Sequence, residues 1–193
     1  MKKIIIPAFI LMVAAQWLVP GKMIFDSEQT LKEGVEFKFK TQPIDPSDPF
    51  RGKYITLNFD ANVWETDTTQ EYYRDQTIYV SVSTDSTGFA RLTGLYTERP
   101  SGQNIHLIKA NVHYSSKYDG KQDIYIRYPF ERFYVEESKA SEAENLYRER
   151  QRDSTQIVYA LVKVKNEQAI LQDVMINGKS IVSIVRELNQ YPK

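Results

Sequence analysis

The first 25 residues carry one long apolar segment. The apolar run extends from Ile4 to Val19, interrupted only by one proline and one glutamine, and a second apolar patch, Met23–Phe25, follows closely. Lys2 and Lys3 stand directly before the run. The run has no amphipathic period, which a helix packed on a soluble core would show, and a basic pair before an apolar run is typical of a segment that enters a membrane.

Two interpretations of this segment remain open. A cleaved signal peptide would have a short apolar centre and small residues before the cut, and Val13–Ala15 before Gln16 fit that description. An uncleaved signal anchor would use Trp17 as an interfacial aromatic and extend to Phe25, with Lys22 reaching back to the membrane surface. We favour the anchor, that is, a transmembrane helix over residues 1–25.

The basic pair also predicts an orientation. Lys2 and Lys3 should stay in the cytoplasm under the positive-inside rule, so that every residue after Phe25 lies outside. We therefore expect a single-pass protein of the cytoplasmic membrane and cell envelope, with a periplasmic C-terminal domain if the cell is Gram-negative.

Alternation of apolar and polar residues predicts that the body is built from strands. In the first stretch Val35, Phe37 and Phe39 alternate with charged residues, which is the period of two of a half-buried strand. The same pattern recurs at Ile55, Leu57 and Phe59, at Ile78, Val80 and Val82, and over residues 89–96, 105–114, 124–128, 157–164 and 169–176. Turn residues such as Asp119-Gly120 separate neighbouring stretches, so antiparallel hairpins are expected.

Two segments of the body have helical patterns. Residues 138–152 are rich in Glu, Ala and Arg without Gly or Pro, and Ser141 with Glu144 resembles a capping box. After Asn177-Gly178, apolar residues from Ile181 to Leu188 recur at helical spacing, although a hairpin across Asn177-Gly178 is an alternative. The predicted fold is thus a β-rich α+β domain over residues 35–193, an antiparallel sheet or sandwich of about eight strands with one or two helices, joined to the transmembrane helix by a polar linker over residues 26–34.

Composition excludes several classes of function. Without Lys2, Lys3 and Lys22, acidic residues slightly outnumber basic ones, whereas nucleic-acid binding needs a concentrated basic face. No phosphate-cradling glycine loop is present, so we expect no nucleotide. The chain has no cysteine and therefore no disulfide or thiolate metal site.

The segment before the second strand is the densest local signal. Three prolines and two aspartates precede Arg51 in residues 43–50, which predicts a rigid loop that delivers Arg51 and Tyr54 to the end of a sheet. We take Asp45, Asp48, Arg51 and Tyr54 as candidate binding residues. The alternative is a purely structural loop in which Arg51 pairs with one of the aspartates.

At this segment the chain resembles a bacterial family named for its GDYXXLXY motif. Gly52, Tyr54 and Leu57 match the motif, whereas Lys53 replaces Asp and Phe59 replaces the final Tyr. The resemblance extends to the N-terminal segment, to residues 132–137 and to residues 176–179, and so covers most of the chain. It implies an envelope protein with a single span, in a family of which some members are encoded beside multi-span membrane proteins, and it supplies no catalytic residues. We therefore expect the membrane, and an integral membrane protein, as partners.

The chain offers no recognisable catalytic or metal-binding constellation. Its two histidines, His106 and His113, would lie on opposite faces of a regular strand, and Asp45, Asp48 and Asp60 have no known ligand spacing. We expect no cofactor and no metal. The favoured function is a non-enzymatic binding or assembly module for an integral membrane or envelope partner, and the alternative is a membrane-tethered hydrolase with its site at the Asp45–Tyr54 loop.

Overall fold

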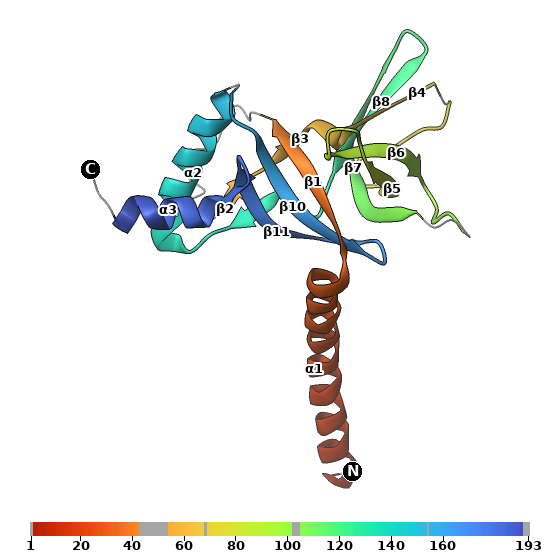
Figure 1. Cartoon of the computed structure of the whole chain (residues 1–193). Helices are drawn as coiled ribbons and strands as arrows, with labels where there is room; N and C mark the ends of the chain where they lie inside the picture. The colour runs from red at the N-terminus through yellow and green to blue at the C-terminus, as the bar shows by residue number, and fades with distance from the viewer. Residues whose placement is uncertain (1, 43–53, 68, 102–104, 154, 191–193) are drawn as a thin grey trace.

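A long helix projects from a β-rich body (Figure 1). The computed structural model describes residues 2–42, 54–67, 69–101, 105–153 and 155–190. Helix α1 (Lys2–Glu33) is followed, within the described residues, by twelve strands, one short 3-10 helix and two further α-helices. This architecture confirms the β-rich α+β fold, with more strands than expected because several are only two to four residues long.

The first sheet is fully antiparallel and has the strand order β12-β11-β10-β1-β3. Its strands are β1 (Val35–Gln42), β3 (Asn58–Phe59), β10 (Val158–Lys165), β11 (Gln168–Ile176) and β12 (Lys179–Ser180). In β1 the predicted alternation places Phe37 and Phe39 in the core, where they lie opposite Val162 and Ala160 of β10. Strands more than a hundred residues apart in the chain therefore form the centre of this sheet.

The second sheet is a separate antiparallel set with the order β4-β8-β7-β5-β6. Its strands are β4 (Val63–Thr66), β5 (Thr77–Thr84), β6 (Ala90–Tyr96), β7 (His106–Tyr118) and β8 (Lys121–Arg127). The predicted turn between β7 and β8 is confirmed, because Asp119 and Gly120 both have the positive φ angles of a tight hairpin turn.

The remaining described elements are a short strand pair, a 3-10 helix and two α-helices. Strands β2 (Tyr54–Thr56) and β9 (Arg132–Tyr134) form a two-stranded pair, and η1 (Asp60–Asn62) lies between β3 and β4. Helix α2 (Glu137–Arg152) packs against α3 (Ile181–Gln190) at the end of the first sheet away from the second (Figure 1). The predicted capping box was wrong: α2 begins at Glu137, so that residue 141 lies inside the helix, where no free N-terminal amides remain to be capped.

The segment after β11 combines both predicted alternatives. Asn177 and Gly178 have positive φ angles and turn the chain into β12, which pairs with the end of β11. Helix α3 then begins directly, at Ile181, and its inner face buries Ile181 and Val185. Because β12 has only two residues, both the hairpin and the helix fit into this segment.

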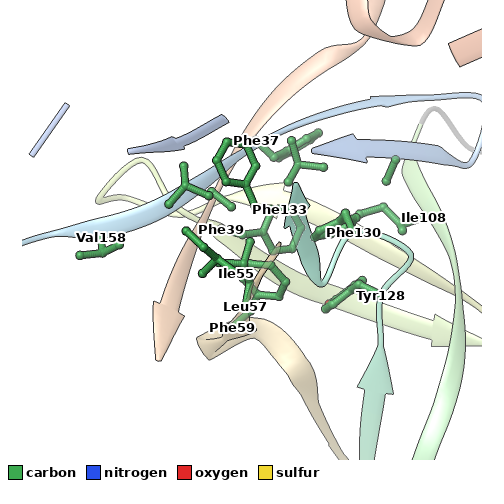
Figure 2. Close-up of a cluster of buried hydrophobic side chains, with 14 of the residues drawn as sticks. Phe37, Phe39, Ile55, Leu57, Phe59, Ile108, Tyr128, Phe130, Phe133 and Val158 are labelled. Atoms are coloured by element: carbon green, nitrogen blue, oxygen red, sulfur yellow. The ribbon is translucent and has the colours of Figure 1, made fainter. Parts of the chain in front are cut away.

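One continuous hydrophobic core connects the sheets (Figure 2). At its centre the ring of Phe39 makes edge contacts with Phe59, Tyr128 and Phe130, at centroid distances of 5.6, 5.6 and 5.1 Å. Such edge-to-face contacts add to the free energy gained by burial. The core therefore joins β1 and the motif strands to the segment between β8 and β9.

The apolar N-terminal segment and the polar stretch after it form a single helix. Residues Ile6–Glu33 of α1 make one helix long and apolar enough to cross a membrane, with a mean hydropathy of 1.6 in its most apolar window, and no part of that window is buried in the protein. Residues 26–34 link the apolar segment to β1. The helix continues through this stretch as far as Glu33, so that Gly34 is the single residue between α1 and β1.

Candidate functional site

Most of the candidate loop falls outside the described residues. This applies to Asp45, Asp48, Arg51, Gly52 and Lys53. Tyr54, Leu57 and Phe59 of the motif are described, and they lie on β2 and β3 or between them. The site can therefore be built from the motif strands and the surfaces that border them.

Tyr54 is part of an aromatic and cationic cluster on the β2–β9 pair. It lies directly opposite Tyr134, with ring centroids 5.5 Å apart, and the guanidinium carbon of Arg132 lies 4.9 Å from the centroid of the Tyr54 ring. Tyr134 is 66% exposed. A guanidinium over a tyrosine face is an attractive cation–π arrangement, so this cluster presents a preformed surface beside the motif.

The other two motif residues serve the core. Leu57 is 2% and Phe59 is 1% exposed. Phe59 packs against Phe39 and Phe130, where a tyrosine hydroxyl would need a buried hydrogen-bond partner. The departure from the family motif at this position is therefore consistent with the packing.

A small hollow of about 240 Å³, which we call the motif hollow, lies beside the motif strands. It is lined by Thr56, Leu57, Asn58, Asn62, His113, Tyr125, Ile126, Arg127 and Glu131. Asn62 donates a hydrogen bond to Asn58 at 2.6 Å, and the Arg127 guanidinium pairs with Asp75. Amide, imidazole, phenol and carboxyl groups from β3, β7, β8 and the β8–β9 segment thus converge on the motif.

Glu131 supplies the carboxyl group of this hollow. Its backbone carbonyl accepts a hydrogen bond from the Leu57 amide at 2.8 Å, and its carboxylate accepts one from the Tyr128 amide at 3.0 Å. Partial burial raises the pKa of the Glu131 carboxyl, and the Tyr128 amide with the charges of Arg127 and Arg132 only partly offsets this effect. A half-buried carboxyl with a raised pKa is a recognised feature of functional sites.

The two histidines lie in different surroundings. His113 is the extra residue of a β-bulge, because the pairing of β7 with β8 shifts between Val112 and Tyr114, so that β7 is not the regular strand assumed from its sequence. His113 lines the motif hollow, whereas His106 packs edge-on against Phe37 at 5.3 Å and lines another hollow. Within the described part of the chain, no group of three or more His, Cys, Asp or Glu residues could hold a metal ion.

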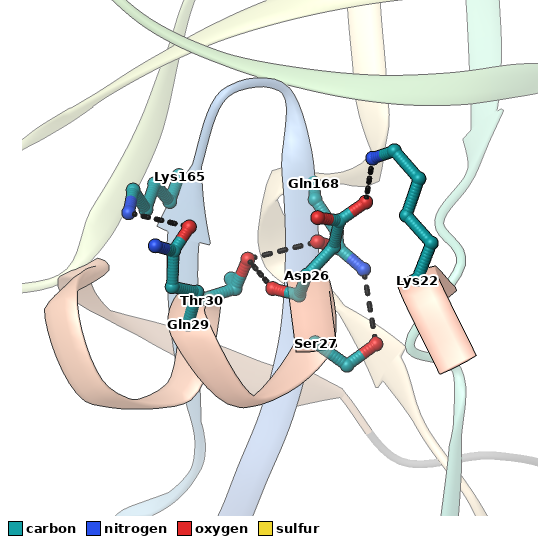
Figure 3. A network of polar contacts seen from close by, with 7 residues as sticks. All are labelled: Lys22, Asp26, Ser27, Gln29, Thr30, Lys165 and Gln168. Atoms are coloured by element: carbon teal, nitrogen blue, oxygen red, sulfur yellow. Dashed lines mark hydrogen bonds and ion pairs between the residues drawn. The ribbon is translucent and has the colours of Figure 1, made fainter. Parts of the chain in front are cut away.

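A second polar cluster joins α1 to the β10–β11 hairpin (Figure 3). The hydroxyl of Thr30, a residue only 2% exposed, lies 2.8 Å from Oε1 of Gln168 and 3.0 Å from the Asp26 carbonyl. The Gln168 amide donates to Ser27 Oγ at 3.2 Å, and Lys165 reaches Gln29 and Glu33. We call this set of contacts the helix clasp.

The tip of the same hairpin also contacts the second sheet. The Glu167 carbonyl accepts a hydrogen bond from the Lys109 amide of β7 at 2.9 Å, and its carboxylate pairs with Arg99 at 2.5 Å. Asn166 and Glu167 both have positive φ angles without being glycine, which costs backbone energy. The tip, residues 165–168, is therefore held in a strained shape that connects α1 to both sheets.

Sequence patterns did not identify Glu131, the bulge at His113 or the helix clasp. Each depends on a contact between segments far apart in the chain: Glu131 with Leu57, and Gln168 with Thr30. The available signal for the clasp was the polar composition of residues 26–33, which is unusual for a helix that continues an apolar one. A bulge leaves no mark in an alternation pattern until the partner strand is known.

Comparison with known proteins gives one match. A family model described as GDYXXLXY protein matches residues 16–174. No curated protein and no solved structure matches the chain. The matched range begins within α1 and includes the motif strands, the motif hollow and the helix clasp.

Proposed function

This chain belongs to the GDYXXLXY protein family, and from that premise we propose that it is a membrane-anchored, extracytoplasmic binding module for an integral membrane partner. In this proposal α1 is an uncleaved signal anchor with Lys2 and Lys3 in the cytoplasm. The β-rich domain lies on the opposite side, which is the periplasm in a Gram-negative cell.

The helix clasp is the observation that carries this proposal. A domain that only needed tethering could hang from a flexible linker, whereas here Gly34 is the only residue between helix and sheet, and Thr30, Gln168 and Lys165 fix the joint. A fixed joint holds the domain at the membrane surface, where the exposed loops of an integral membrane protein are within reach.

We assign partner contact to the Tyr54–Arg132–Tyr134 cluster. Tyrosine and arginine are the residue types enriched at protein interfaces, and Tyr134 is exposed while its backbone is fixed in β9. The candidate residues Asp45, Asp48 and Arg51 precede this cluster in the chain and belong to the same proposal.

A photo-crosslinking experiment in membranes tests the proposal. A photoreactive phenylalanine analogue at Tyr134 should capture an integral membrane protein that mass spectrometry identifies. Tyr73 is the matched control, because it is similarly exposed, at 64%, but lies in the segment before β5. Capture of the same proteins from both positions, or of no integral membrane protein from Tyr134, would contradict the proposal.

A membrane-tethered hydrolase is the second candidate, and one observation favours it. Glu131, whose pKa is raised by burial, lines the same hollow as His113, and these are the residue types used in general acid–base catalysis. In a cellular assay, Glu131→Gln and His113→Asn should abolish function at unchanged protein abundance if the hydrolase is correct. For a binding module, Tyr134 crosslinking should persist in both variants.

A further inference from the structure

The helix clasp lies at a predictable depth once α1 crosses a bilayer. Residues Ile4–Phe25 span roughly 33 Å as an α-helix, close to the ~30 Å of a hydrocarbon core. The headgroup layer adds about 5 to 8 Å on each side, which is the rise of roughly the next five helical residues. Ser27 and Thr30, and the hairpin residue Gln168 bonded to them, therefore lie at headgroup depth.

A hollow of about 260 Å³ opens at this depth between α1 and the hairpin. Lys22, Asp26 and Gln29 of α1 border it on one side, and Lys165, Asn166 and Gln168 of the hairpin border it on the other. In a membrane, the molecules that surround such a hollow are phospholipids, so its walls face a headgroup.

Each charged side chain on the walls already has an opposite partner, and Glu33, the partner of Lys165, lies outside the lining of the hollow. Lys22 pairs with Asp26 at 2.6 Å, and Lys165 pairs with Glu33. An anionic headgroup would bring an uncompensated negative charge into this site, which is unfavourable where water is partly excluded. A headgroup that carries one positive and one negative charge preserves the balance.

We propose that this hollow binds a zwitterionic phospholipid headgroup in which a phosphodiester is joined to a primary ammonium. The phosphodiester accepts hydrogen bonds from the ammonium of Lys22 and the side-chain amides of the hairpin, and the lipid ammonium donates to the Asp26 carboxylate. The lipid thereby replaces one ion pair by two. A quaternary choline headgroup has no N–H to donate and fits the site less well.

This inference rests on the membrane-crossing part of the proposed function, and the test separates the two. The full-length chain is purified in mild detergent, mixed with equal amounts of phosphatidylethanolamine, phosphatidylcholine and phosphatidylglycerol, and examined by native mass spectrometry. Phosphatidylethanolamine should be retained in preference to the other two lipids. Equal retention of all three, or preference for phosphatidylglycerol, would overturn the inference.

Lys22→Ala is the informative variant, because Lys22 is 75% exposed at its side chain and takes no part in the helix clasp. It should reduce phosphatidylethanolamine retention roughly ten-fold, the effect of losing one charge-assisted hydrogen bond. Lys22→Arg should restore retention. Lys32→Ala is the matched control, since Lys32 also pairs with a carboxylate of α1 but does not line the hollow; equal losses in both alanine variants would refute the site.

Two further measurements complete the test. Carbonate extraction should leave the parent chain and all variants in the membrane pellet. Release of the parent chain from the pellet would refute the membrane anchor. Retention of the parent chain in the pellet without a lipid preference in mass spectrometry would refute the headgroup site alone. Excess soluble glycerophosphoethanolamine should not displace the lipid, because it lacks the acyl chains that hold the headgroup at this depth. Displacement would identify a soluble phosphodiester as the ligand instead of a lipid.

Discussion

The joint between α1 and β1 leaves no room for a side chain at Gly34. A Cβ atom at this position would lie 2.4 Å from the Thr30 carbonyl oxygen and 3.1 Å from the Val164 amide nitrogen. Both neighbours are backbone atoms and cannot rotate away. The requirement for glycine here is one of space.

Gly34→Ala should therefore lower the free energy of unfolding by about 1 to 3 kcal/mol, the usual cost of overpacking. The measurement is guanidinium unfolding of the purified chain in mild detergent, followed by far-UV circular dichroism. Gly21→Ala is the control, because nothing lies within 4 Å of a Cβ at Gly21. Equal stability of the two variants would show that the joint relaxes easily.

Gln122 and Gln168 should respond in opposite directions to the same substitution. Gln122 is 2% exposed, and within the described residues neither of its amide atoms has a hydrogen-bond partner, whereas Gln168 bonds both Thr30 and Ser27. Gln122→Met should raise the free energy of unfolding by about 1 to 2 kcal/mol, and Gln168→Met should lower it by about 1 kcal/mol. Thermal unfolding of both variants measures the sign of each change in stability. A less stable Gln122→Met variant would show that the Gln122 amide has a hydrogen-bond partner.

The pKa of Glu131 predicts how this carboxyl affects stability across pH. Burial raises the folded-state pKa above the ordinary value of 4.5, so that the folded chain binds the proton more tightly than the unfolded chain. The stability that Glu131 contributes is thus present below pH 4.5 and is lost as the pH rises through the folded-state pKa. Asp85, whose pKa is lowered by hydrogen bonds from the Thr87 hydroxyl and the Phe89 amide, acts in the opposite direction.

Glu131→Gln keeps the acceptor for the Tyr128 amide but removes the titration. The stability of this variant relative to the parent should therefore increase as the pH rises through the Glu131 pKa and then remain constant. Urea unfolding at a series of pH values from acidic to neutral measures this difference. A constant difference at all pH values would mean that Glu131 is as well solvated in the folded protein as in the unfolded chain.

Among the elements, the short motif strands β2 and β3 are stabilised mainly by the core. Leu57→Ala should cost about 2 to 5 kcal/mol, because Leu57 is almost fully buried. Thr56→Ala, at an exposed position of the same segment, should stay within about 0.5 kcal/mol of the parent. Equilibrium unfolding of both variants measures the contrast, and a small effect at Leu57 would indicate that the motif segment detaches easily from the core.

The elements that sequence patterns predicted well are those with one buried face. Phe37 and Phe39 of β1, and Ile78 and Val80 of β5, are buried as their alternation indicated. Helix starts were less predictable: the N-cap of α2 is Glu136, which makes no side-chain cap bond. No local signal marked this start, whereas the Ser141 pattern matched a capping box by composition alone.

Contacts between distant elements could not be predicted from the sequence. The pairing of β1 with β10 and the contact of α1 with the β10–β11 hairpin join segments more than a hundred residues apart. Periodicity determines which face of an element is buried but carries no information about which element covers it. The candidate site shares this limit, because motif spacing identified Tyr54 but not Arg132, which lies over its ring.

At the scale of the whole molecule, the proposed orientation makes a direct prediction. A C-terminal alkaline phosphatase fusion should be active, and a reporter that works only in the cytoplasm should be silent, because Lys2 and Lys3 keep the N-terminus inside. The intact mass of the chain from membranes should include the first 15 residues if α1 is an uncleaved anchor. The reverse reporter result would contradict the orientation, and a mass lacking residues 1–15 would show cleavage before Gln16.

In the proposed orientation, the single-residue joint at Gly34 fixes the rotation of the body about the axis of α1 as well as its height above the bilayer. Each helical residue advances by about 100° and 1.5 Å. One residue inserted between Phe25 and Asp26 would therefore rotate the body by a little more than a quarter turn about the axis of α1 and move it only about 1.5 Å along that axis. Seven inserted residues would bring the body to within about 20° of its original rotation, but roughly 10 Å further along the axis of α1. If α1 crosses the membrane as proposed, the face of α1 that a neighbouring protein contacts inside the membrane therefore determines which sheet edge that protein meets outside it.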